Sequence, residues 1–495
     1  MESLPPRLSW ARWPVFVLVA LVGLGIRLPQ LKARPMHTDE AVNAYVVGEL
    51  LAGEPFDYDP QDRHGPALAA LGLPLVRMQG ARSLSDLTES ELRLTSVTAG
   101  TATILLFGAA AEMFGFTPCL LSALMFAVAP LPVYYDRYFI HESLFCMATF
   151  GLILSSLRLF NTRSIVYGAL AGGCAALMLA CKETALLHFF ALSVAAFVFW
   201  LRNLRRRTVD LSLLLRPFLA ASATFLALIV ILFTWFGRNW KSVRTLWQVV
   251  PDVFARAAGQ GHQEPYWYFG RLLAGGWSGG MLAGLACLGF FFAVRRREVS
   301  AFQWLAYYAL LLGAIYSLIP YKTPWLALNL WLPLALFAAL ATEVFCHWAS
   351  RQFGRRVAFL ALCILAAFAG VLIIHDTRQR VFLHPADESN PYAYAQTSDD
   401  ILELPNEIAE MARQNGMSSP RIAVIASDPW PLPWYLRHFN QVGFWQPGTQ
   451  VPDADFYVTS TEAADQYADR LRGLRPDFFG SRPGVLVLLW LPGPK

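Results

Sequence analysis

The chain has 495 residues, of which 56% are hydrophobic and only 15% are charged. Soluble domains carry about 25% charged residues, so this composition excludes an ordinary soluble protein and indicates an integral membrane protein. The net charge of +5 comes largely from arginine clusters between hydrophobic segments, a pattern typical of membrane orientation and not of nucleic-acid binding.

The first predicted element is a hydrophobic helix over residues 13–28. Arg7 and Arg12 precede its apolar core, as in a signal peptide, but no cleavage site of small residues follows. We therefore expect this segment to stay attached as a signal-anchor helix, with its start in the cytoplasm.

The first loop, residues 29–93, begins with the polar motif His37-Thr38-Asp39-Glu40, which opens an amphipathic run over residues 41–51. Two interpretations of this motif are open. Thr38 can cap a helix, with Asp39 and Glu40 in the first turn, where the helix dipole favours negative charge. Alternatively, one carboxylate is a general base at the membrane surface, because two adjacent carboxylates beside a membrane span are costly to place.

Farther along this loop, residues 57–66 are dense in acids and turn residues. Asp57 and Asp59 can bind a divalent cation through oxygen ligands, but acid-rich turns also form for hydrogen-bonding reasons alone. The candidate metal ligands are Asp39, Asp57, Asp59 and His64. The apolar run 67–78 is short and is predicted to lie on the membrane surface.

Hydrophobic segments long enough to cross a bilayer as helices recur up to residue 374. About eleven are predicted, at 13–28, 94–114, 118–133, 139–159, 165–181, 185–201, 211–236, 277–294, 302–319, 324–345 and 357–374. Arginines gather in alternate loops, at 158–163, 202–207, 295–297 and 351–356. The positive-inside rule makes those loops cytoplasmic. The longer loop 237–276 is then outside, although it is also basic.

This topology brings further polar clusters to the same outer face as the His37 motif. They are Asp136, Arg137, His141, Glu142, Lys182, Glu183, Tyr321 and Lys322. Each cluster taken singly has an ordinary explanation, such as an interfacial ion pair or a snorkelling lysine. Together, at helix ends on one face, they predict a single site.

After residue 375 the segments become shorter and more polar. Helices are predicted near 404–414, 433–438 and 462–471, and strands at 422–426, 456–459 and 485–489. This pattern predicts a small α/β domain on the outer side. The chain is thus divided into a transmembrane domain, residues 1–375, and an extracytoplasmic domain, residues 376–495. The cysteines lie in or beside apolar segments without a CxxC pair, which indicates packing and not zinc binding.

An anchor helix followed by an acidic pair in the first outer loop resembles the GT-C superfamily of membrane glycosyltransferases. That superfamily includes the protein O-mannosyltransferases and the enzyme that adds aminoarabinose to lipid A. The resemblance is closer to a bacterial and archaeal subfamily described as mannosyltransferase-like, or as flippase-associated in archaeal N-glycosylation. The motifs that carry it are His37-x-Asp39-Glu40, Tyr58-Asp59-Pro60, His64-Gly65-Pro66, Phe139-Ile140-His141-Glu142, Lys182-Glu183 and Lys322-Thr323-Pro324-Trp325.

The resemblance implies inverting transfer of a sugar from a polyprenyl-phosphate-linked donor to a lipid, glycan or protein acceptor. It implies that the reaction occurs on the outer face of the plasma membrane. Asp39 is then the base that deprotonates the acceptor hydroxyl, with Glu40 beside it as the second catalytic carboxylate. The leaving lipid phosphate needs cations, for which Lys182, Lys322 and Arg137 are candidates. The other residues predicted to contact substrate or a divalent cation are His37, Tyr58, Asp59, His64, Asp136, His141, Glu142, Glu183 and Tyr321.

The main alternative is a translocator of lipid-linked sugars, or an accessory to one. Transporters usually carry polar residues near the bilayer midplane and broken helices in repeated halves. Here the charges gather at the outer helix ends and no repeat is visible, which favours the enzyme. A third interpretation, a scaffold for an envelope complex, rests on the C-terminal domain and leaves Lys182-Glu183 unexplained.

Overall fold

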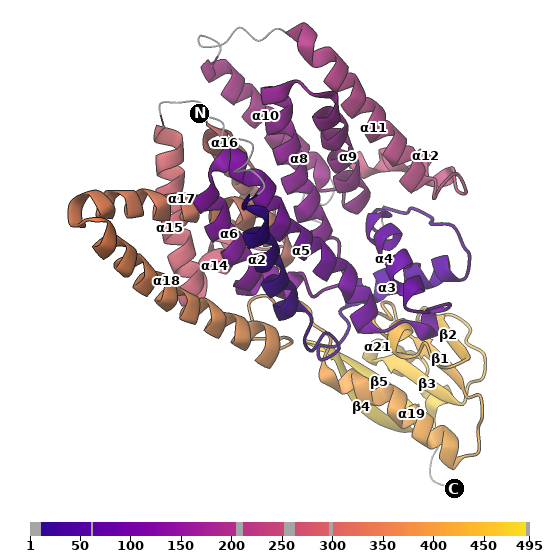
Figure 1. The fold of residues 1–495 in the computed structure, drawn as a ribbon. Helices are drawn as coiled ribbons and strands as arrows, with labels where there is room; N and C mark the ends of the chain where they lie inside the picture. Colours follow the sequence, from indigo (N-terminus) through magenta and orange to yellow (C-terminus); the bar gives the residue numbers. More distant parts are fainter. Residues whose placement is uncertain (1–10, 61–62, 204–210, 252–262, 297–299, 492–495) are drawn as a thin grey trace. The chain divides into compact units, whose positions relative to one another are not determined.

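The computed structural model describes residues 11–60, 63–203, 211–251, 263–296 and 300–491 (Figure 1). Arg7, Arg205 to Arg207 and Arg297, which contribute to the predicted orientation, lie outside the described residues. The chain forms two compact units. The helical unit comprises Met1–Leu31, Pro55–Gly72 and Arg93–Pro385, and the mixed unit comprises Lys32–Glu54, Leu73–Leu92 and Ala386–Lys495.

The described part of the helical unit is made up mainly of helices. They are α2 (Trp13–Arg27), α6 (Phe116–Val128), α7 (Pro130–Tyr135), α8 (Glu142–Thr162), α9 (Ile165–Cys181), α10 (Ala185–Asn203), α11 (Leu215–Phe233), α12 (Lys241–Thr245), α14 (Tyr268–Ala274), α15 (Gly276–Arg295), α16 (Ala301–Leu318), α17 (Ala327–Phe353) and α18 (Arg355–Thr377). Two further helices, α4 (Ala67–Met78) and α5 (Glu89–Phe114), contribute residues to both units.

Eight helices of the described chain are long and apolar enough to cross a membrane, namely α5, α8, α10, α11, α15, α16, α17 and α18. Helices α2, α6 and α9 are apolar but shorter. Every predicted span coincides with one of these helices, so the predicted helical membrane architecture is confirmed, while the number of spans stays a prediction. The predicted span 118–133 is divided, because Pro130 lacks the N–H that would continue α6 and instead opens α7.

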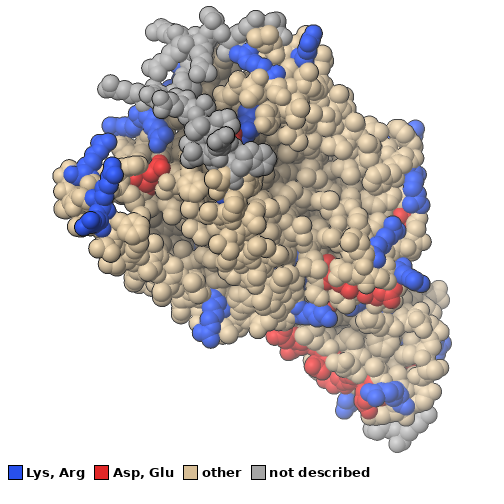
Figure 2. All heavy atoms as spheres, in the orientation of Figure 1, with Lys and Arg blue, Asp and Glu red and all other residues tan. Residues whose placement is uncertain are grey.

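Helix α17 packs against α15, α6 and α18. Within its most apolar stretch 89% of the residues are buried, against 11% for α18 and α11. The outward apolar side chains of α18 include Phe359, Ile364 and Phe368. Figure 2 shows that the visible surface of these helices carries few charges. Such uncharged faces suit contact with lipid.

Close helix contacts depend on small residues in this unit. A Cβ atom on Gly168 or Gly172 of α9 would lie 2.2 or 2.0 Å from the carbonyl oxygens of Pro217 and Ala221 on α11. Only glycine allows the two backbones to approach this closely, as is common in helix pairs within membranes.

The mixed unit contains a five-stranded sheet with the order β2-β1-β3-β5-β4. Its strands are β1 (Arg421–Ile425), β2 (Gln441–Trp445), β3 (Phe456–Ser460), β4 (Arg475–Arg482) and β5 (Val485–Leu491). Strand β1 runs parallel to β2 and β3, and β5 runs antiparallel to β3 and β4. The helices are α3 (Thr38–Leu51), α19 (Glu403–Gln414), α20 (Leu432–Tyr435), α21 (Thr461–Gln466) and α22 (Ala468–Leu471). The predicted small C-terminal sheet domain is confirmed.

Two strands of this sheet were not predicted, and both lie at its edges. In β2 every residue is partly or fully exposed and Gly443 interrupts the apolar pattern. Strand β4 begins with Arg475-Pro476-Asp477, which is typical of a loop. An edge strand tolerates proline and charge because one of its sides forms no ladder hydrogen bonds.

Segments of the first loop form part of the mixed unit. The backbone N–H of Met36 donates to the Tyr435 hydroxyl at 2.8 Å, and the Thr397 hydroxyl donates to the Met36 carbonyl at 2.7 Å. The Gln396 side chain donates to the Pro35 carbonyl at 3.0 Å. These bonds hold the chain just before the Asp39 motif in a defined position.

Candidate functional site

The Asp39 motif forms the start of α3, and its N-cap is His37. The prediction that Thr38 is the cap is wrong, because Thr38 is already the first helical residue. The His37 Nδ1 atom accepts the Asp39 backbone N–H at 3.1 Å, and the Glu40 carboxylate accepts the His37 backbone N–H at 3.1 Å. This reciprocal pair is a capping box, with histidine in the position that serine or threonine usually occupies.

The cap also fixes the tautomer of His37. Because Nδ1 accepts a hydrogen bond, the proton of the neutral ring is on Nε2, which donates to the Tyr394 carbonyl at 3.0 Å. Both ring nitrogens of His37 and one Glu40 oxygen are therefore engaged in hydrogen bonds that hold the start of α3. This use of His37 and Glu40 supports the capping interpretation of the sequence for these two residues.

Asp39 differs from its neighbours because only its backbone takes part in the cap. Its side chain is partly exposed, whereas Glu40 is fully buried. The Asp39 carboxylate has no hydrogen-bond or ion-pair partner among the residues that the structure describes. Asp39 is thus the carboxylate of the pair that is available to accept a proton.

Replacing His37 with alanine should loosen the start of α3. The variant loses the acceptor for the Asp39 N–H and the donor to Tyr394, and losing a cap costs about 1 kcal/mol. Exchange of the Asp39 and Ala41 amides with deuterium should then be about five times faster than in the wild type. An unchanged exchange rate would show that the side chain of His37 contributes nothing to the helix start.

In the helical unit, the predicted pair Lys182-Glu183 lies at the break between α9 and α10. Lys182 is extended and ends α9. Its Nζ atom lies 2.5 Å from the Glu142 carboxylate at the start of α8. One oxygen of Glu183 lies 2.9 Å from His64 Nδ1, and the other accepts the Tyr58 hydroxyl at 3.1 Å. The break thus gathers side chains from three distant parts of the sequence.

His141 completes this group. Its ring meets the His64 ring edge to face, with centroids 5.3 Å apart, and its Nε2 atom lies 3.2 Å from the Gly65 carbonyl oxygen. We call the set Tyr58, His64, His141, Glu142, Lys182 and Glu183 the Lys182-Glu183 cluster. These six residues lie together in the structure, and their membership of one substrate site stays a prediction.

The backbone beside this cluster has no spare room at Gly65. A Cβ atom there would lie 2.2 Å from the Ala180 carbonyl oxygen, one residue before the end of α9. Gly65→Ala should therefore move His64 away from Glu183 and lower the melting temperature of the purified protein by several degrees. Gly25→Ala is the matched control, because nothing lies within 4 Å of its Cβ position. Equal melting temperatures for the two variants would contradict this packing argument.

A cavity that is partly open to solvent lies beside the cluster. Its polar lining comes from Lys182, Glu183 and Tyr321, and its aromatic lining from Phe269 of α14 and Tyr316 of α16. The cavity combines a cation, a carboxylate and aromatic faces. Ligand sites are typically of this kind, apolar with a few convergent polar groups.

Tyr316 reaches this cavity as the end of a buried hydrogen-bond chain that the sequence analysis missed. His188 is fully buried, with Nε2 2.7 Å from the Tyr316 hydroxyl and Nδ1 2.8 Å from the Tyr308 hydroxyl. A single histidine inside an apolar segment gives no signal of its own. The only hint is the recurrence of tyrosine on the predicted span 302–319.

Lys322 has its ammonium group turned to the backbone. It is 1% exposed and donates to the carbonyl oxygens of Ile319 at 2.6 Å and Glu264 at 2.9 Å. These bonds hold the turn before α17 in place. The geometry supports a structural role for Lys322 beside the cavity-lining Tyr321.

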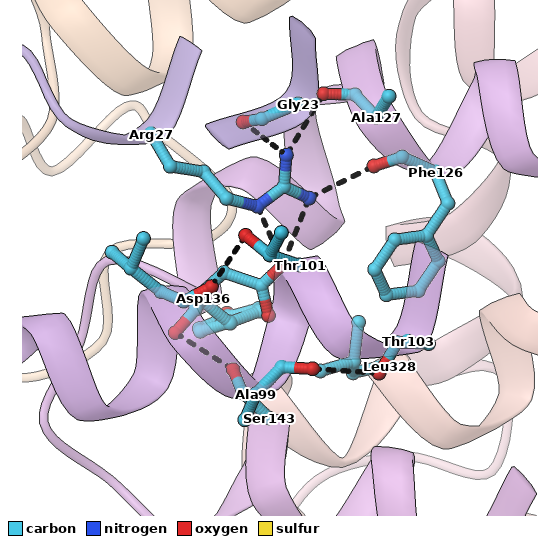
Figure 3. Close-up of polar contacts among 12 residues, drawn as sticks. Gly23, Arg27, Ala99, Thr101, Thr103, Phe126, Ala127, Asp136, Ser143 and Leu328 are labelled. Carbon is cyan, nitrogen blue, oxygen red and sulfur yellow. Dashed lines mark hydrogen bonds and ion pairs between the residues drawn. The ribbon is translucent and has the colours of Figure 1, made fainter. Parts of the chain in front are cut away.

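Asp136, which Figure 3 shows beside Arg27, and Arg137 are both held by the end of α2. Asp136 forms a fully buried ion pair with Arg27 at 2.8 Å. Arg137 donates to the backbone carbonyls of Arg27 at 2.7 Å and Gln30 at 3.1 Å. Both residues thus fasten the chain that follows the first helix, and their side-chain bonds serve the fold.

Asp57, one of the candidate metal ligands, is engaged by neighbouring side chains. Asp57 binds Lys241 at 3.0 Å and Asn239 at 3.1 Å, and although burial raises its pKa, these hydrogen bonds hold the pKa below its usual value. Within the described ranges, no group of three or more His, Cys, Asp or Glu side chains is arranged to hold a metal ion. A divalent cation stays an expectation from the resemblance.

The predicted site residues thus form two sets. His37, Asp39 and Glu40 belong to the mixed unit, while the Lys182-Glu183 cluster, Tyr321 and Lys322 belong to the helical unit. Asp59 follows Tyr58 in the same loop. The convergence of Asp39 with Lys182 and Lys322 on one reacting centre stays a prediction.

Part of the chain matches a known protein family model. The family model described as dolichyl-phosphate-mannose-protein mannosyltransferase matches residues 78–236. This range includes Glu142, Lys182 and Glu183 but not Asp39. No curated protein sequence matches the chain.

Several solved structures match the fold at low sequence identity. The crystal structure of ArnT from Cupriavidus metallidurans bound to undecaprenyl phosphate has a TM-score of 0.65 and 15% identity, over 97% of this chain and 99% of that chain. The archaeal oligosaccharyltransferase AglB from Archaeoglobus fulgidus, in complex with an inhibitory peptide and a dolichol-phosphate, has a TM-score of 0.60 and 14% identity, over 98% of this chain and 74% of that chain. An apo crystal structure of the Archaeoglobus fulgidus oligosaccharyltransferase has a TM-score of 0.59 and 12% identity, over 87% of this chain and 64% of that chain.

These matches show that the chain shares the fold of ArnT and of the oligosaccharyltransferase, so the resemblance predicted from the motifs is confirmed at the level of the fold.

Proposed function

We propose that the chain is an inverting glycosyltransferase that moves a sugar from a polyprenyl-phosphate-linked donor to an acceptor on the outer face of the plasma membrane. The observation that carries the proposal is the ArnT match, which extends over 97% of this chain to a structure bound to undecaprenyl phosphate. A lipid phosphate of that kind is what remains of such a donor after the sugar has left.

Asp39 is the proposed base. The acceptor oxygen attacks the anomeric carbon of the sugar, and the bond between that carbon and the phosphate oxygen breaks. The electron pair goes to the phosphate, and the proton of the acceptor hydroxyl goes to Asp39. A single displacement of this kind inverts the anomeric configuration. The proposal is supported by the partly exposed Asp39 carboxylate at the rigid start of α3.

The Lys182-Glu183 cluster is the proposed place of the leaving phosphate. Negative charge grows on this phosphate as the bond breaks, and preorganised cations stabilise such charge. Lys182 lines the cavity and is held by Glu142 at 2.5 Å, so its position is fixed before the donor binds. The aromatic walls, Phe269 and Tyr316, suit the apolar faces of a sugar or of the first isoprene units.

The acceptor is proposed to be a lipid, a glycan or a protein beside the membrane, with the sheet of the mixed unit on the extracytoplasmic side. This sidedness follows from the arginine-bearing loops, which the positive-inside rule makes cytoplasmic.

The proposal is tested by following radiolabelled sugars from a panel of polyprenyl-phosphate donors in membranes with and without the protein. Label that moves into a new product only when the protein is present would support a glycosyltransferase. A translocator would give a different result. No donor would then yield product, and loss of the protein would strand lipid-linked sugar on the inner leaflet.

A further inference from the structure

The segment that follows α11 and contains α12 (Figure 1) presents a surface that takes no part in lining the cavity. Residues 236–250 contain three basic residues, two tryptophans and no acid. The predicted topology puts this segment on the outer side, where the positive-inside rule does not account for basic residues. The charges of the segment therefore need another explanation.

The exposed side chains of this segment lie on one helical face. Trp240, Arg244 and Trp247 recur every three or four residues through α12 and the 3₁₀ turn that follows it, so they project to the same side. The two tryptophans are 58% and 69% exposed. Ser242 and Val249, which share another face, are buried. The segment thus buries a serine and exposes its two largest apolar side chains.

The orientation of this face is fixed by hydrogen bonds on its buried side. The Ser242 hydroxyl accepts the Tyr58 backbone N–H at 2.9 Å, and the Thr245 hydroxyl donates to the Tyr58 carbonyl at 3.1 Å. Just before the helix, the Asn239 side chain donates to the Phe56 carbonyl at 3.0 Å. The segment cannot turn its tryptophans inward without breaking these bonds, so their exposure is a property of the fold.

Arg244 lies between the two tryptophans and is not used by the fold. Its side chain is exposed and forms no hydrogen bond or ion pair with any residue that the structure describes. The face therefore offers a guanidinium group flanked by two indole rings. A cation beside amphipathic aromatic rings suits an anionic group at the boundary between lipid and water.

The described part of the loop before α15 repeats this combination. Tyr266, Trp267 and Trp277 are 69%, 53% and 81% exposed, and Arg271 is also exposed. Tryptophan, tyrosine and arginine each have an apolar body and a polar tip, so they gather where a membrane protein meets lipid headgroups. The same combination before α15 and after α11 indicates a membrane interface.

The apolar surface of α11 leads directly to the face of Trp240, Arg244 and Trp247. Leu226 and Ile231 are exposed along α11. Phe236, which is 65% exposed, follows the end of this helix. Such side chains suit the hydrocarbon part of a bilayer, so the segment after them is expected at the depth of the headgroups. This continuity favours membrane lipid over a soluble partner.

We propose that Trp240, Arg244 and Trp247 form a binding surface for anionic phospholipid headgroups, with the indole rings in the headgroup layer and the Arg244 guanidinium on the lipid phosphate. Lipids with a net negative charge are preferred because the segment has basic residues and no acid. The inference goes beyond the proposed function, since this lipid is a component of the bilayer and not the sugar donor. No covalent bond forms or breaks.

The test uses the full-length chain labelled with fluorotryptophan, in nanodiscs of phosphatidylcholine that contain no polyprenyl lipid. The fluorine signals of Trp240 and Trp247 are identified by their loss in Trp240→Phe and Trp247→Phe. Spin-labelled phosphatidylglycerol or spin-labelled phosphatidylcholine is then added in small amounts, and each broadens the signals of residues close to it. We expect both signals to be broadened by the lipid labels, more strongly by phosphatidylglycerol, and not by a water-soluble gadolinium chelate.

Arg244→Gln separates the charge of the surface from its position. The variant should lower the ratio of broadening by phosphatidylglycerol to broadening by phosphatidylcholine about fivefold, the effect of removing one cation near an anionic lipid surface. The tryptophans should stay in contact with lipid. Arg413→Gln is the matched control, because it removes an arginine with a 75% exposed side chain from α19, and it should keep the wild-type ratio.

The inference is overturned if the soluble chelate broadens the two signals and the lipid labels do not, since the face would then meet water or a soluble partner. The same ratio in the wild type and in folded Arg244→Gln would overturn the assignment to anionic headgroups. Neither result involves sugar transfer. Failure of this inference therefore leaves the proposed function standing, and failure of sugar transfer leaves this inference standing.

Discussion

Asp39→Asn should lower sugar transfer at least about a hundredfold, since general base catalysis typically contributes factors of 10² to 10⁴. The substitution removes the proton acceptor and nearly keeps the shape. It should also leave the helix start intact, because Asp39 enters the capping box only through its backbone N–H. The loss of transfer is checked by initial rates of label transfer at matched protein concentration. The intact helix start is checked by melting temperatures recorded in parallel.

Glu40→Gln is the matched control for this variant. Glutamine at that position can still accept the His37 backbone N–H, as glutamate does at 3.1 Å. The change should therefore reduce transfer less than about tenfold. The assignment of the base to Asp39 is contradicted if Glu40→Gln is the more damaging of the two, or if Asp39→Asn transfers sugar at the wild-type rate.

Arg27→Met should destabilise the helical unit by about 3–5 kcal/mol, the usual cost of removing one partner of a buried ion pair. Arg27 is fully buried and binds Asp136 at 2.8 Å, and it also donates to the carbonyls of Gly23, Phe126 and Ala127 (Figure 3). Without it, the buried Asp136 carboxylate would lose its counter-ion. Yield of folded protein in detergent and its thermal unfolding measure the loss.

The double variant Arg27→Met with Asp136→Leu should recover part of that stability, because it leaves no unpaired charge. Lys241→Met provides an exposed comparison. Its pair with Asp57 is 3.0 Å long, but the two side chains are 70% and 52% exposed, so its loss should cost less than about 1 kcal/mol. If Arg27→Met unfolds at the same temperature as Lys241→Met, the buried pair does not hold α2 in place.

The transmembrane helices could be predicted from the sequence because apolar runs of sufficient length have few alternatives to a helix in lipid. The residues at which these helices begin and end were harder to predict. Helix α8 begins at Glu142 and not at residue 139, because the polar turn before it keeps the chain irregular up to His141. The edge strands β2 and β4 were missed because edges tolerate exposure, glycine and proline.

The candidate site was predicted as a set of residue types but not as a set of contacts. Lys182 and Lys322 look alike in the sequence, yet one lines the cavity and the other binds backbone carbonyls. Whether His37 or Thr38 caps α3 depends on the Tyr394 carbonyl, which is more than 350 residues away in the chain. Contacts of such separation leave no periodic signal, so hydropathy and spacing do not predict them.

The most direct test of the proposed sugar transfer uses the purified chain in detergent micelles, which have no inner and outer leaflet. Radiolabelled polyprenyl-phosphate sugar is supplied together with an acceptor extract, and covalently labelled product is measured for the wild type and for Asp39→Asn. We expect labelled product with inverted anomeric configuration from the wild type and almost none from the variant. Absence of product from every donor, with wild-type protein that still binds the lipid phosphate, would contradict a glycosyltransferase and favour the translocator.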